Sequence, residues 1–376
     1  ESGDAGDSFL HHPQHPKATN GSRRYAIMNE HGERRECLRE RARAKGWDGF
    51  IVTYPPNLYW LLGFSGSSGT ALILNDRIEL LVDGRYFEQA RQETAECIVV
   101  QSDRAFDPAL RKHLPAGAIL GFEANHLSYS DYLQLCEWHD GGRLRAASGW
   151  LEELRMVKSA QEIALLEHAC RQTVQVHEDF EQQRIAGATE RELAGLLEFL
   201  SRRRGSEGPS FSTIVASGEH SALPHATPRN VSVDSDEVLL VDFGLKLDRY
   251  CSDLTRTSPG KTPGVEEIAA VVRRAQEAAI AEVAPGVKAK AVDAAARGVI
   301  EGAGYGDRFL HSTGHGLGLE IHEPPRLASG VETLLETGMV ITVEPGIYLP
   351  GRFGVRIEDV VVVTETGCRL LTSQLE

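Results

Sequence analysis

Residues 239–244 read Leu239-Leu240-Val241-Asp242-Phe243-Gly244, an apolar run typical of a buried strand that contains one carboxylate. A carboxylate in such a strand costs several kcal/mol unless it is paired or bound to a metal. Three more acids stand beside apolar runs: Asp253 before Leu254, Glu344 after Met339-Val340-Ile341-Thr342-Val343, and Glu358 before Val360-Val361-Val362-Val363. Four acids in strand-like segments therefore predict cations between the strands.

One histidine, His315, completes the set of candidate metal ligands. Carboxylates with a single imidazole suit Mn²⁺, Co²⁺ or Zn²⁺, and a set without cysteine disfavours a structural zinc site. Two ions are expected, because four acids around one ion would leave negative charge uncompensated. Two divalent ions about 3.5–4 Å apart lower the pKa of a bridging water and polarise a carbonyl group. The ligand set therefore predicts a hydrolase that cleaves amide bonds.

The composition narrows the class of protein. A chain of 376 residues with 41% hydrophobic content is expected to form two domains. A net charge of −14 disfavours nucleic-acid binding, and no apolar run approaches the length of a transmembrane helix, so we expect a soluble protein. The six cysteines are scattered without a Cys-x-x-Cys pair, which favours buried thiols in a reducing compartment and thus a cytoplasmic protein.

The first part of the chain reads as a tail followed by a small α/β domain. Residues 1–27 lack helical periodicity and predict a flexible tail, and residues 28–150 alternate helices with short strands. The expected elements are a helix over Glu33–Lys45, strands over Gly49–Thr53, Thr70–Leu74 and Glu79–Asp83, and a helix over Tyr86–Glu93. The glycines Gly63, Gly66 and Gly69 lead into a strand, so they indicate turns and not a phosphate-binding loop.

Residues 151–376 form the second expected domain, in which one order of elements occurs twice. Two capping boxes, Ser159-x-x-Glu162 and Thr189-x-x-Glu192, begin two helices that strands follow. Helices are predicted again near Val265–Glu282 and Lys288–Gly302, and strands follow again. This order indicates two related halves that pack face to face, with the first half giving two acids, the second half the other ligands, and a metal pair between two sheets.

Several motifs together resemble the proline-specific branch of the pita-bread metallopeptidases, the prolidases and X-prolyl aminopeptidases. The motifs are Val241-Asp242-Phe243-Gly244, Ser252-Asp253-Leu254-Thr255-Arg256-Thr257, Gly314-His315-Gly316-Leu317-Gly318-Leu319-Glu320-Ile321-His322-Glu323, Val343-Glu344-Pro345-Gly346 and Val355-Arg356-Ile357-Glu358-Asp359. The resemblance spans nearly the whole chain from Met28. It implies a two-domain α/β protein, with a small creatinase-like N-terminal α/β domain and a C-terminal pita-bread domain, an α+β fold with a pseudo-two-fold axis.

The resemblance also implies a role for each site residue. Asp242 would bind one metal, His315 and Glu344 the other, and Asp253 and Glu358 would bridge both. Glu344 would also accept a proton from the attacking water. The metal-free residues would be His225 and His322, which stabilise the oxyanion or pass a proton to the proline nitrogen, and Arg356, which pairs with an acid or orients the substrate. Structural positions are expected for other histidines, such as His113, His139, His168, His177, His220 and His311.

The implied activity is hydrolysis of the Xaa-Pro bond of short peptides by a metal-bridging hydroxide. The resemblance also implies a homodimer with two divalent ions per subunit. Mn²⁺ is the expected ion, and Co²⁺ or Zn²⁺ are the alternatives. We expect an Xaa-Pro dipeptidase, with an X-prolyl aminopeptidase for longer peptides as the alternative. Some prolidases bind the substrate carboxylate with an arginine at the position that falls on Gly330, so Arg326, the N-terminal domain or a partner subunit would have to supply that cation.

Other classes fit the sequence less well. A methionine aminopeptidase lacks the N-terminal domain. A creatinase-like hydrolase or a metal-free binding module would have lost metal ligands, whereas this chain keeps all five.

Overall fold

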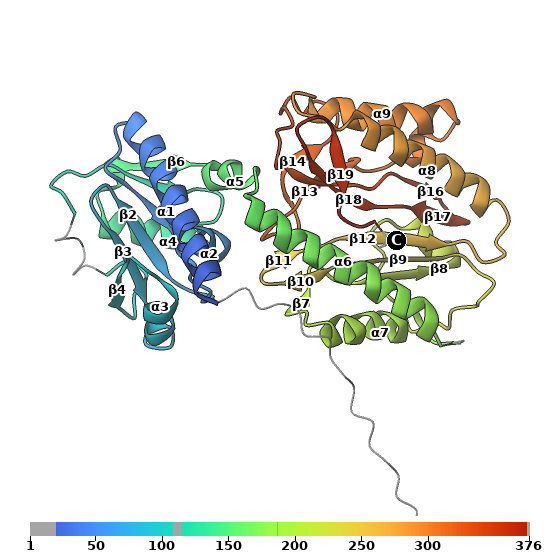
Figure 1. Ribbon diagram of the computed structural model, residues 1–376, viewed down its shortest axis with the longest axis horizontal. Coiled ribbons are helices and arrows are strands. Elements are labelled where there is room, and N and C mark those ends of the chain that lie inside the picture. The colour runs from blue at the N-terminus through green and yellow to red at the C-terminus, as the bar shows by residue number, and fades with distance from the viewer. Residues whose placement is uncertain (1–19, 108–110, 112–113, 186, 374–376) are drawn as a thin grey trace, which may run out of the picture. The chain divides into compact units, whose positions relative to one another are not determined.

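The computed structural model describes residues 20–107, 111, 114–185 and 187–373. The chain divides between Trp150 and Leu151 into two compact units, unit 1 and unit 2, which are described separately (Figure 1). Among the described residues, no helix is both long enough and apolar enough to cross a membrane.

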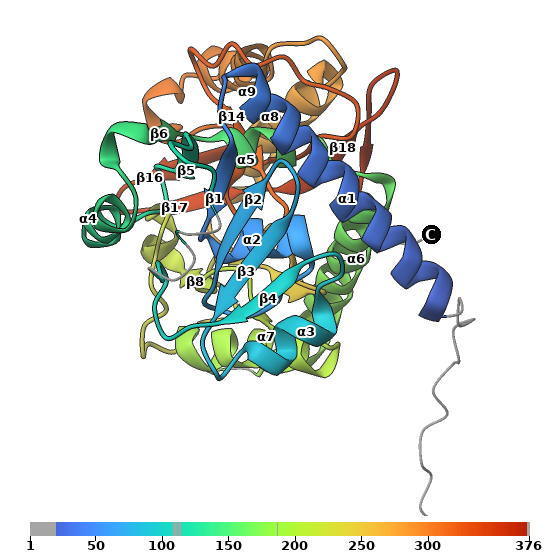
Figure 2. The same cartoon turned by 90° about the vertical axis from the view of Figure 1, so that its left-hand side faces the viewer.

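Unit 1 is built on a six-stranded mixed sheet with helices beside it (Figure 2). The strand order is β4-β3-β2-β1-β5-β6, with β1, β2 and β3 antiparallel and the outer pairs parallel. The strands are β1 (Gly49–Val52), β2 (Thr70–Leu74), β3 (Ile78–Val82), β4 (Ile98–Gln101), β5 (Leu120–Glu123) and β6 (Leu144–Ala147). The helices are α1 (Asn20–Ala44), α2 (Pro55–Leu62), α3 (Phe87–Glu93), α4 (Tyr129–Trp138) and the 3₁₀ helix η2 (Gly141–Arg143). These elements match the predicted α/β pattern within one residue at most strand ends.

The predicted flexible tail is wrong in part. Helix α1 begins at Asn20, inside the predicted tail of residues 1–27, whereas residues 1–19 lie outside the described part of the chain. The physical reason is that residues 22–28 contain neither glycine nor proline, so nothing in them ends a helix that continues to Ala44.

Unit 2 repeats one arrangement twice. In its first half (residues 160–258) two helices precede a sheet of order β12-β9-β8, and in its second half (residues 265–370) two helices precede a sheet of order β14-β13-β15-β18-β19. In the first half β9 pairs antiparallel with both β8 and β12, and in the second half β15 pairs antiparallel with both β13 and β18. Figure 1 shows α8 and α9 on one side of the strands and α7 on the opposite side. The expected two halves are therefore present.

The elements of unit 2 have the following bounds. The first half contains α6 (Ala160–Gln183), α7 (Glu190–Arg203), β7 (Gly208–Pro209), β8 (Ile214–Ser217), η3 (Gly218–Ala222), β9 (Leu239–Phe243), β10 (Leu245–Leu247), β11 (Tyr250–Cys251) and β12 (Leu254–Ser258). The second half contains α8 (Val265–Glu282), α9 (Ala289–Gly302), η4 (Gly306–Arg308), β13 (Gly314–Gly316), β14 (Glu323–Leu327), β15 (Val340–Val343), β16 (Gly346–Leu349), β17 (Phe353–Arg356), β18 (Asp359–Val363) and β19 (Cys368–Leu370). Helix α5 (Trp150–Arg155) precedes both halves.

Local sequence explains where the helices begin. Both predicted capping boxes form, because Ser159 and Thr189 each accept from the backbone three residues on, and Glu162 and Glu192 each accept from the cap backbone in return. Each half then buries its own apolar cluster. Phe180, Leu197 and Val241 belong to the cluster of the first half, and helices α8 and α9 share the other cluster with β15 and β18. These two cores fix the sheets that carry the predicted ligands.

The expectation of buried cysteines is only partly correct. All six thiols are free, but only Cys170 and Cys251 are buried, and Cys37 is exposed. Cys37 lies in the charged helix α1, whose outer face is solvated, so a scattered cysteine there is not covered by the core.

Candidate active site

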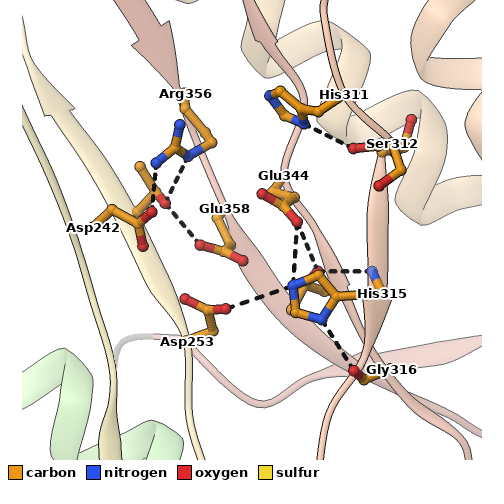
Figure 3. A network of polar contacts seen from close by, with 12 residues as sticks. Asp242, Asp253, His311, Ser312, His315, Gly316, Glu344, Arg356 and Glu358 are labelled. Carbon is orange, nitrogen blue, oxygen red and sulfur yellow. Dashed lines mark hydrogen bonds and ion pairs between the residues drawn. The ribbon is translucent and has the colours of Figure 1, made fainter. Parts of the chain in front are cut away.

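The five predicted metal ligands converge between the two halves of unit 2 (Figure 3). Asp242 lies in β9 and Asp253 immediately precedes β12, whereas His315 lies in β13, Glu344 follows β15 and Glu358 precedes β18. His315 Nε2 lies 3.4 Å from Glu344 Oε1 and 3.8 Å from Asp253 Oδ2. The side chains of Asp253, His315 and Glu358 each offer one ligand atom, and these atoms lie within 4.8 Å of one another. The two halves thus contribute acids from corresponding strands.

Glycines permit this close approach of backbones. A Cβ on Gly244, two residues after Asp242, would lie 1.9 Å from the carbonyl oxygen of Ser252. A Cβ on Gly314, next to His315, would lie 1.9 Å from the carbonyl oxygen of Thr342. Both distances are impossible for real atoms, so only glycine brings these strands close enough to place Asp242, Asp253 and His315 together.

The carboxylates have unsatisfied oxygens. Asp242 Oδ1, Asp253 Oδ1 and Glu358 Oε1 are buried without a hydrogen-bond partner from the described residues. Burial, together with the neighbouring acids, holds the pKa of Asp253 and that of Glu358 well above the usual range. For Glu344, burial first and the charge of Asp242 next raise the pKa to about 8 against the opposing charge of Arg356. Buried acids with free lone pairs fit divalent cations, and these residues therefore suit a metal site.

Neighbouring groups orient the candidate ligands. His315 Nδ1 donates to the carbonyl oxygen of Gly316 at 3.0 Å, which leaves Nε2 as the acceptor that faces the acids. Burial lowers the pKa of His315 to about 4, so its ring is neutral as a ligand requires. Thr255 Oγ1 donates to Glu358 Oε2 at 2.7 Å. The ligand set is thus held in place by ordinary hydrogen bonds of the protein.

A cavity of about 790 Å³ opens onto this cluster. Its wall contains the predicted residues His225, His322 and Arg356 as well as apolar side chains. The apolar and small residues of the wall are Phe211, Ile214, Pro224, Ala226, Pro228, Ile321 and Pro324. A cavity that combines apolar walls with convergent polar groups is typical of a site for a small organic ligand.

The predicted metal-free residues take different positions. His225 and His322 are exposed to the cavity, and the ring of His322 lies 4.5 Å from that of His315, nearly perpendicular to it. Arg356 is buried and pairs through Nη2 with Asp242 Oδ2. Its Nη1 donates to Tyr348 Oη at 2.7 Å and to the carbonyl oxygen of Pro224 at 3.2 Å. Of the two roles expected for Arg356, pairing with an acid is the one that the structure contains.

One of the histidines expected at a structural position lies on the cavity wall. His311 lines the cavity, and its Nε2 lies 2.8 Å from Tyr348 Oη. Because Tyr348 Oη accepts from Arg356, its own proton points to His311 Nε2, and His311 Nδ1 donates to Ser312. The only signal in the sequence is its position four residues before His315. In a loop, such a spacing does not fix the distance between two side chains, so it could not identify His311 as a cavity residue.

Comparison with known proteins gives the class of protein. Residues 164–365 match "Metallopeptidase family M24", and residues 34–157 match "Creatinase/Prolidase N-terminal domain". The chain belongs to metallopeptidase family M24 and is a peptidase hydrolase. The predicted fold class, a creatinase-like N-terminal domain followed by a pita-bread domain, is confirmed. The family implies divalent metals.

Individual relatives narrow the comparison. The Xaa-Pro dipeptidase of Pyrococcus furiosus is 37% identical over 328 residues, which cover 86% of this chain and 93% of that protein. Two solved structures are also similar. An Xaa-Pro dipeptidase from Bacillus anthracis has a TM-score of 0.87 at 37% identity and covers 92% of this chain and 98% of its own. An X-Pro aminopeptidase from Thermotoga maritima has a TM-score of 0.80 at 36% identity and covers 88% and 96%.

Proposed function

We propose that this peptidase is an Xaa-Pro dipeptidase, which hydrolyses the bond between an N-terminal residue and a following proline. The relatives named above support an Xaa-Pro substrate, although they include both a dipeptidase and an aminopeptidase. The five candidate ligands, the partly apolar cavity beside them and its two exposed histidines suit hydrolysis of a small peptide.

The metal site is proposed to hold two divalent ions per subunit. Mn²⁺ is the preferred assignment, with Co²⁺ or Zn²⁺ as alternatives. Asp242 would hold one ion, His315 and Glu344 the other, and Asp253 and Glu358 both. When bound, such ions supply an activated water and polarise the scissile carbonyl group.

The protein residues would do the remaining chemistry. Glu344, ionised as a metal ligand, would take a proton from the attacking water. His225 and His322 face the cavity, where an imidazole can stabilise the developing oxyanion or pass a proton to the proline nitrogen. Arg356 would keep Asp242 in position, because its guanidinium is already engaged by protein groups.

One observation carries the preference for a dipeptide. Arg326 lies in β14 on the cavity wall, and its guanidinium has no hydrogen bond or ion pair within the described part of the chain. Its charge still reaches the site, since it adds to the effect of burial and of His225 in lowering the pKa of His322. An unpaired guanidinium in a cavity is suited to bind the free carboxylate of a C-terminal proline.

An X-prolyl aminopeptidase is the second candidate. Arg326 is exposed, and the cavity of about 790 Å³ is within the range of sites for ligands larger than a dipeptide. A third residue would therefore find space, and the similarity to the Thermotoga maritima aminopeptidase favours the same activity.

The deciding experiment compares Ala-Pro with Ala-Pro-Ala and with Ala-Pro amide in Mn²⁺ buffer. A dipeptidase should prefer Ala-Pro, and Arg326→Met should lower kcat/KM for Ala-Pro by about 10- to 100-fold, as expected for a lost charge-assisted hydrogen bond. The same variant should change cleavage of the amide little, because the amide has no carboxylate. Equal or better cleavage of the tripeptide would establish the aminopeptidase, and activity that survives chelation would point to a creatinase-like hydrolase.

We also propose that the enzyme is a cytoplasmic homodimer. The six free thiols suit a reducing compartment, and the resemblance to the prolidases supports the dimer. Light scattering after size-exclusion chromatography tests the dimer, and fractionation of the source cells tests the compartment.

A further inference from the structure

The loop that carries His225 is bound at both ends to one buried carboxylate. Glu190, the first residue of helix α7, is fully buried. At one end of the loop, Glu190 Oε1 accepts from the Ser217 backbone at 2.9 Å and from Ser217 Oγ at 3.0 Å. At the other end, Glu190 Oε2 accepts from the Arg229 backbone at 2.9 Å. A single side chain therefore closes the segment 217–229, which is called the His225 loop below.

Charge strengthens this closure. The guanidinium of Arg229 donates to both oxygens of Glu190, from Nε at 3.1 Å and from Nη2 at 3.0 Å. His220 Nδ1 lies 3.0 Å from Oε2 as a further partner. Burial alone would raise the pKa of Glu190, but these hydrogen bonds outweigh burial and lower it to about 2. Glu190 is thus ionised, and both of its oxygens are occupied by groups of the loop.

Helix α7 does not need this carboxylate as a cap. Thr189 and Glu192 form the capping box that satisfies the start of the helix, and Glu192 is exposed. An acid at the first position would help the helix dipole equally well from the surface. The buried orientation of Glu190 therefore has its explanation in the loop and not in the helix.

The His225 loop is packed in its first part and open in its second: Ser221 and Ala222 of η3 are buried, and the backbone N–H of Gly354 donates to Ser221 Oγ at 2.9 Å. Residues 224–228 form one wall of the cavity, and Leu223, His225 and Thr227 are exposed. Between Leu223 and Arg229 only Ala226 is buried, in a small apolar cluster with Ile214, Ala216 and Leu240. This second part of the loop therefore depends on polar anchors for a fixed conformation, namely the hydrogen bond from Arg356 Nη1 to the carbonyl oxygen of Pro224 and the contacts of Arg229 with Glu190.

We propose that Glu190 is a positioning residue that holds His225 at the cavity by fixing both ends of its loop. The proposal rests on the function proposed above for the importance of His225 in turnover, but the closure of the loop does not depend on that function. Glu190 touches none of the five candidate ligands, so it is expected to act on the geometry of His225 without changing the metal content.

The test is Glu190→Gln, with Glu192→Gln as the matched control on the same helical turn. Glutamine has the size of glutamate but would turn an amide NH₂ toward Ser217 or Arg229, which are donors already. Hydrogen–deuterium exchange of peptides covering 217–229 should become at least about tenfold faster in Glu190→Gln and stay unchanged in Glu192→Gln. This readout needs neither substrate nor bound metal.

The kinetic arm asks whether the effect passes through His225. Glu190→Gln should lower kcat/KM for Ala-Pro by about 10- to 100-fold, the scale of a misplaced catalytic group, with metal content as in the wild type. In a His225→Ala background the same change should lower it by less than about threefold, because coupled residues are not additive. An equal loss in both backgrounds would show a general effect and overturn the proposal, as would unchanged exchange of the loop.

Two further outcomes are separable. If Glu190→Gln does not fold, Arg229→Met removes a partner whose side chain is 46% exposed, and it should accelerate exchange at the Arg229 end of the loop. Unchanged exchange there would again contradict the closure. If the wild type does not cleave Ala-Pro at all, the proposed function is wrong, while the exchange experiment still decides whether Glu190 holds the loop.

Discussion

Arg356 Nη2 donates to Asp242 Oδ2, while Asp242 Oδ1 is buried without a partner among the described residues. One carboxylate is thus divided between two tasks. The oxygen that faces Arg356 is neutralised inside the protein, and the other remains available to a cation. Because the guanidinium is also bound by Tyr348 and Thr255, it fixes the direction in which the free oxygen points.

Replacing this arginine should separate metal binding from turnover. Arg356→Met removes a positive charge beside the acids, so the metal content should be retained, whereas kcat/KM should fall by at least about 10²-fold as Asp242 loses its orientation. Elemental analysis and Ala-Pro hydrolysis measure the two effects. Arg352→Met is the control, since Arg352 is exposed and close in the chain. Loss of metal in Arg356→Met, or full activity, would contradict this division of roles.

The two acids proposed to bridge both ions should be more sensitive to substitution than any other ligand. Asp253→Asn or Glu358→Gln keeps the side-chain volume but replaces one oxygen by an NH₂ group, which cannot bind a cation. Each change should lower the bound metal by at least one ion and abolish turnover. Asp236→Asn, at an exposed acid, should leave both unchanged. Full metal content in either bridging variant would refute the bridging assignment.

Short-range sequence features predicted the frame of this site well. The capping boxes at Ser159 and Thr189 begin helices where expected, and the predicted helix Val265–Glu282 has the bounds of α8. These features depend on neighbours within one helical turn. The ligands were found because a charged residue in an apolar run is costly and thus informative.

Contacts between distant segments were not predictable in the same way. Glu190 and Arg229 are separated by 39 positions, and His311 and Tyr348 by 37. An acid at a helix start normally reads as a solvated cap, and nothing within one turn of Glu190 indicates that it is buried. The residues that hold the catalytic loops were therefore visible only when the fold had brought them together.

The metal-free protein should become less stable as the pH rises from about 6.5 to 8. Glu344 has a folded pKa of about 8, whereas an unfolded glutamate has a pKa of about 4.3, so in this range the folded state binds the extra proton and stability falls with pH. Buried histidines with lowered pKa values, such as His177 and His315, act in the opposite direction but only below about pH 6.5.

Thermal unfolding of chelator-treated protein at pH 6.5, 7.2 and 8 measures this slope. Mn²⁺ should raise the unfolding temperature more at pH 8 than at pH 6.5, because metal binding displaces the proton. Glu344→Gln cannot titrate and should show a shallower slope. A metal-free protein that gains stability over this range would contradict the raised pKa.

The buried ion pair between Lys158 and Glu323, which follows His322 in the chain, should contribute far more to stability than a surface pair. Lys158 Nζ lies 3.1 Å from Glu323 Oε2, and both side chains are 2% exposed. Arg155 Nη2 lies 2.6 Å from Oε1, the other oxygen of Glu323. Lys158→Met keeps the apolar stem and one cation but leaves Glu323 with a buried oxygen unpaired, so it should destabilise unit 2 by about 2–4 kcal/mol.

Lys261→Met is the matched control, because Lys261 and Asp236 pair at the surface with side chains 78% and 53% exposed. Urea unfolding should be followed by circular dichroism. Dichroism is chosen because the helices of unit 2 contribute to it, whereas Trp47, Trp60, Trp138 and Trp150 all belong to unit 1. Lys158→Met should shift the dichroism transition to lower urea, whereas Lys261→Met should not. Equal transitions for the two variants would mean that Arg155 alone suffices to hold Glu323 and would contradict the predicted effect of Lys158.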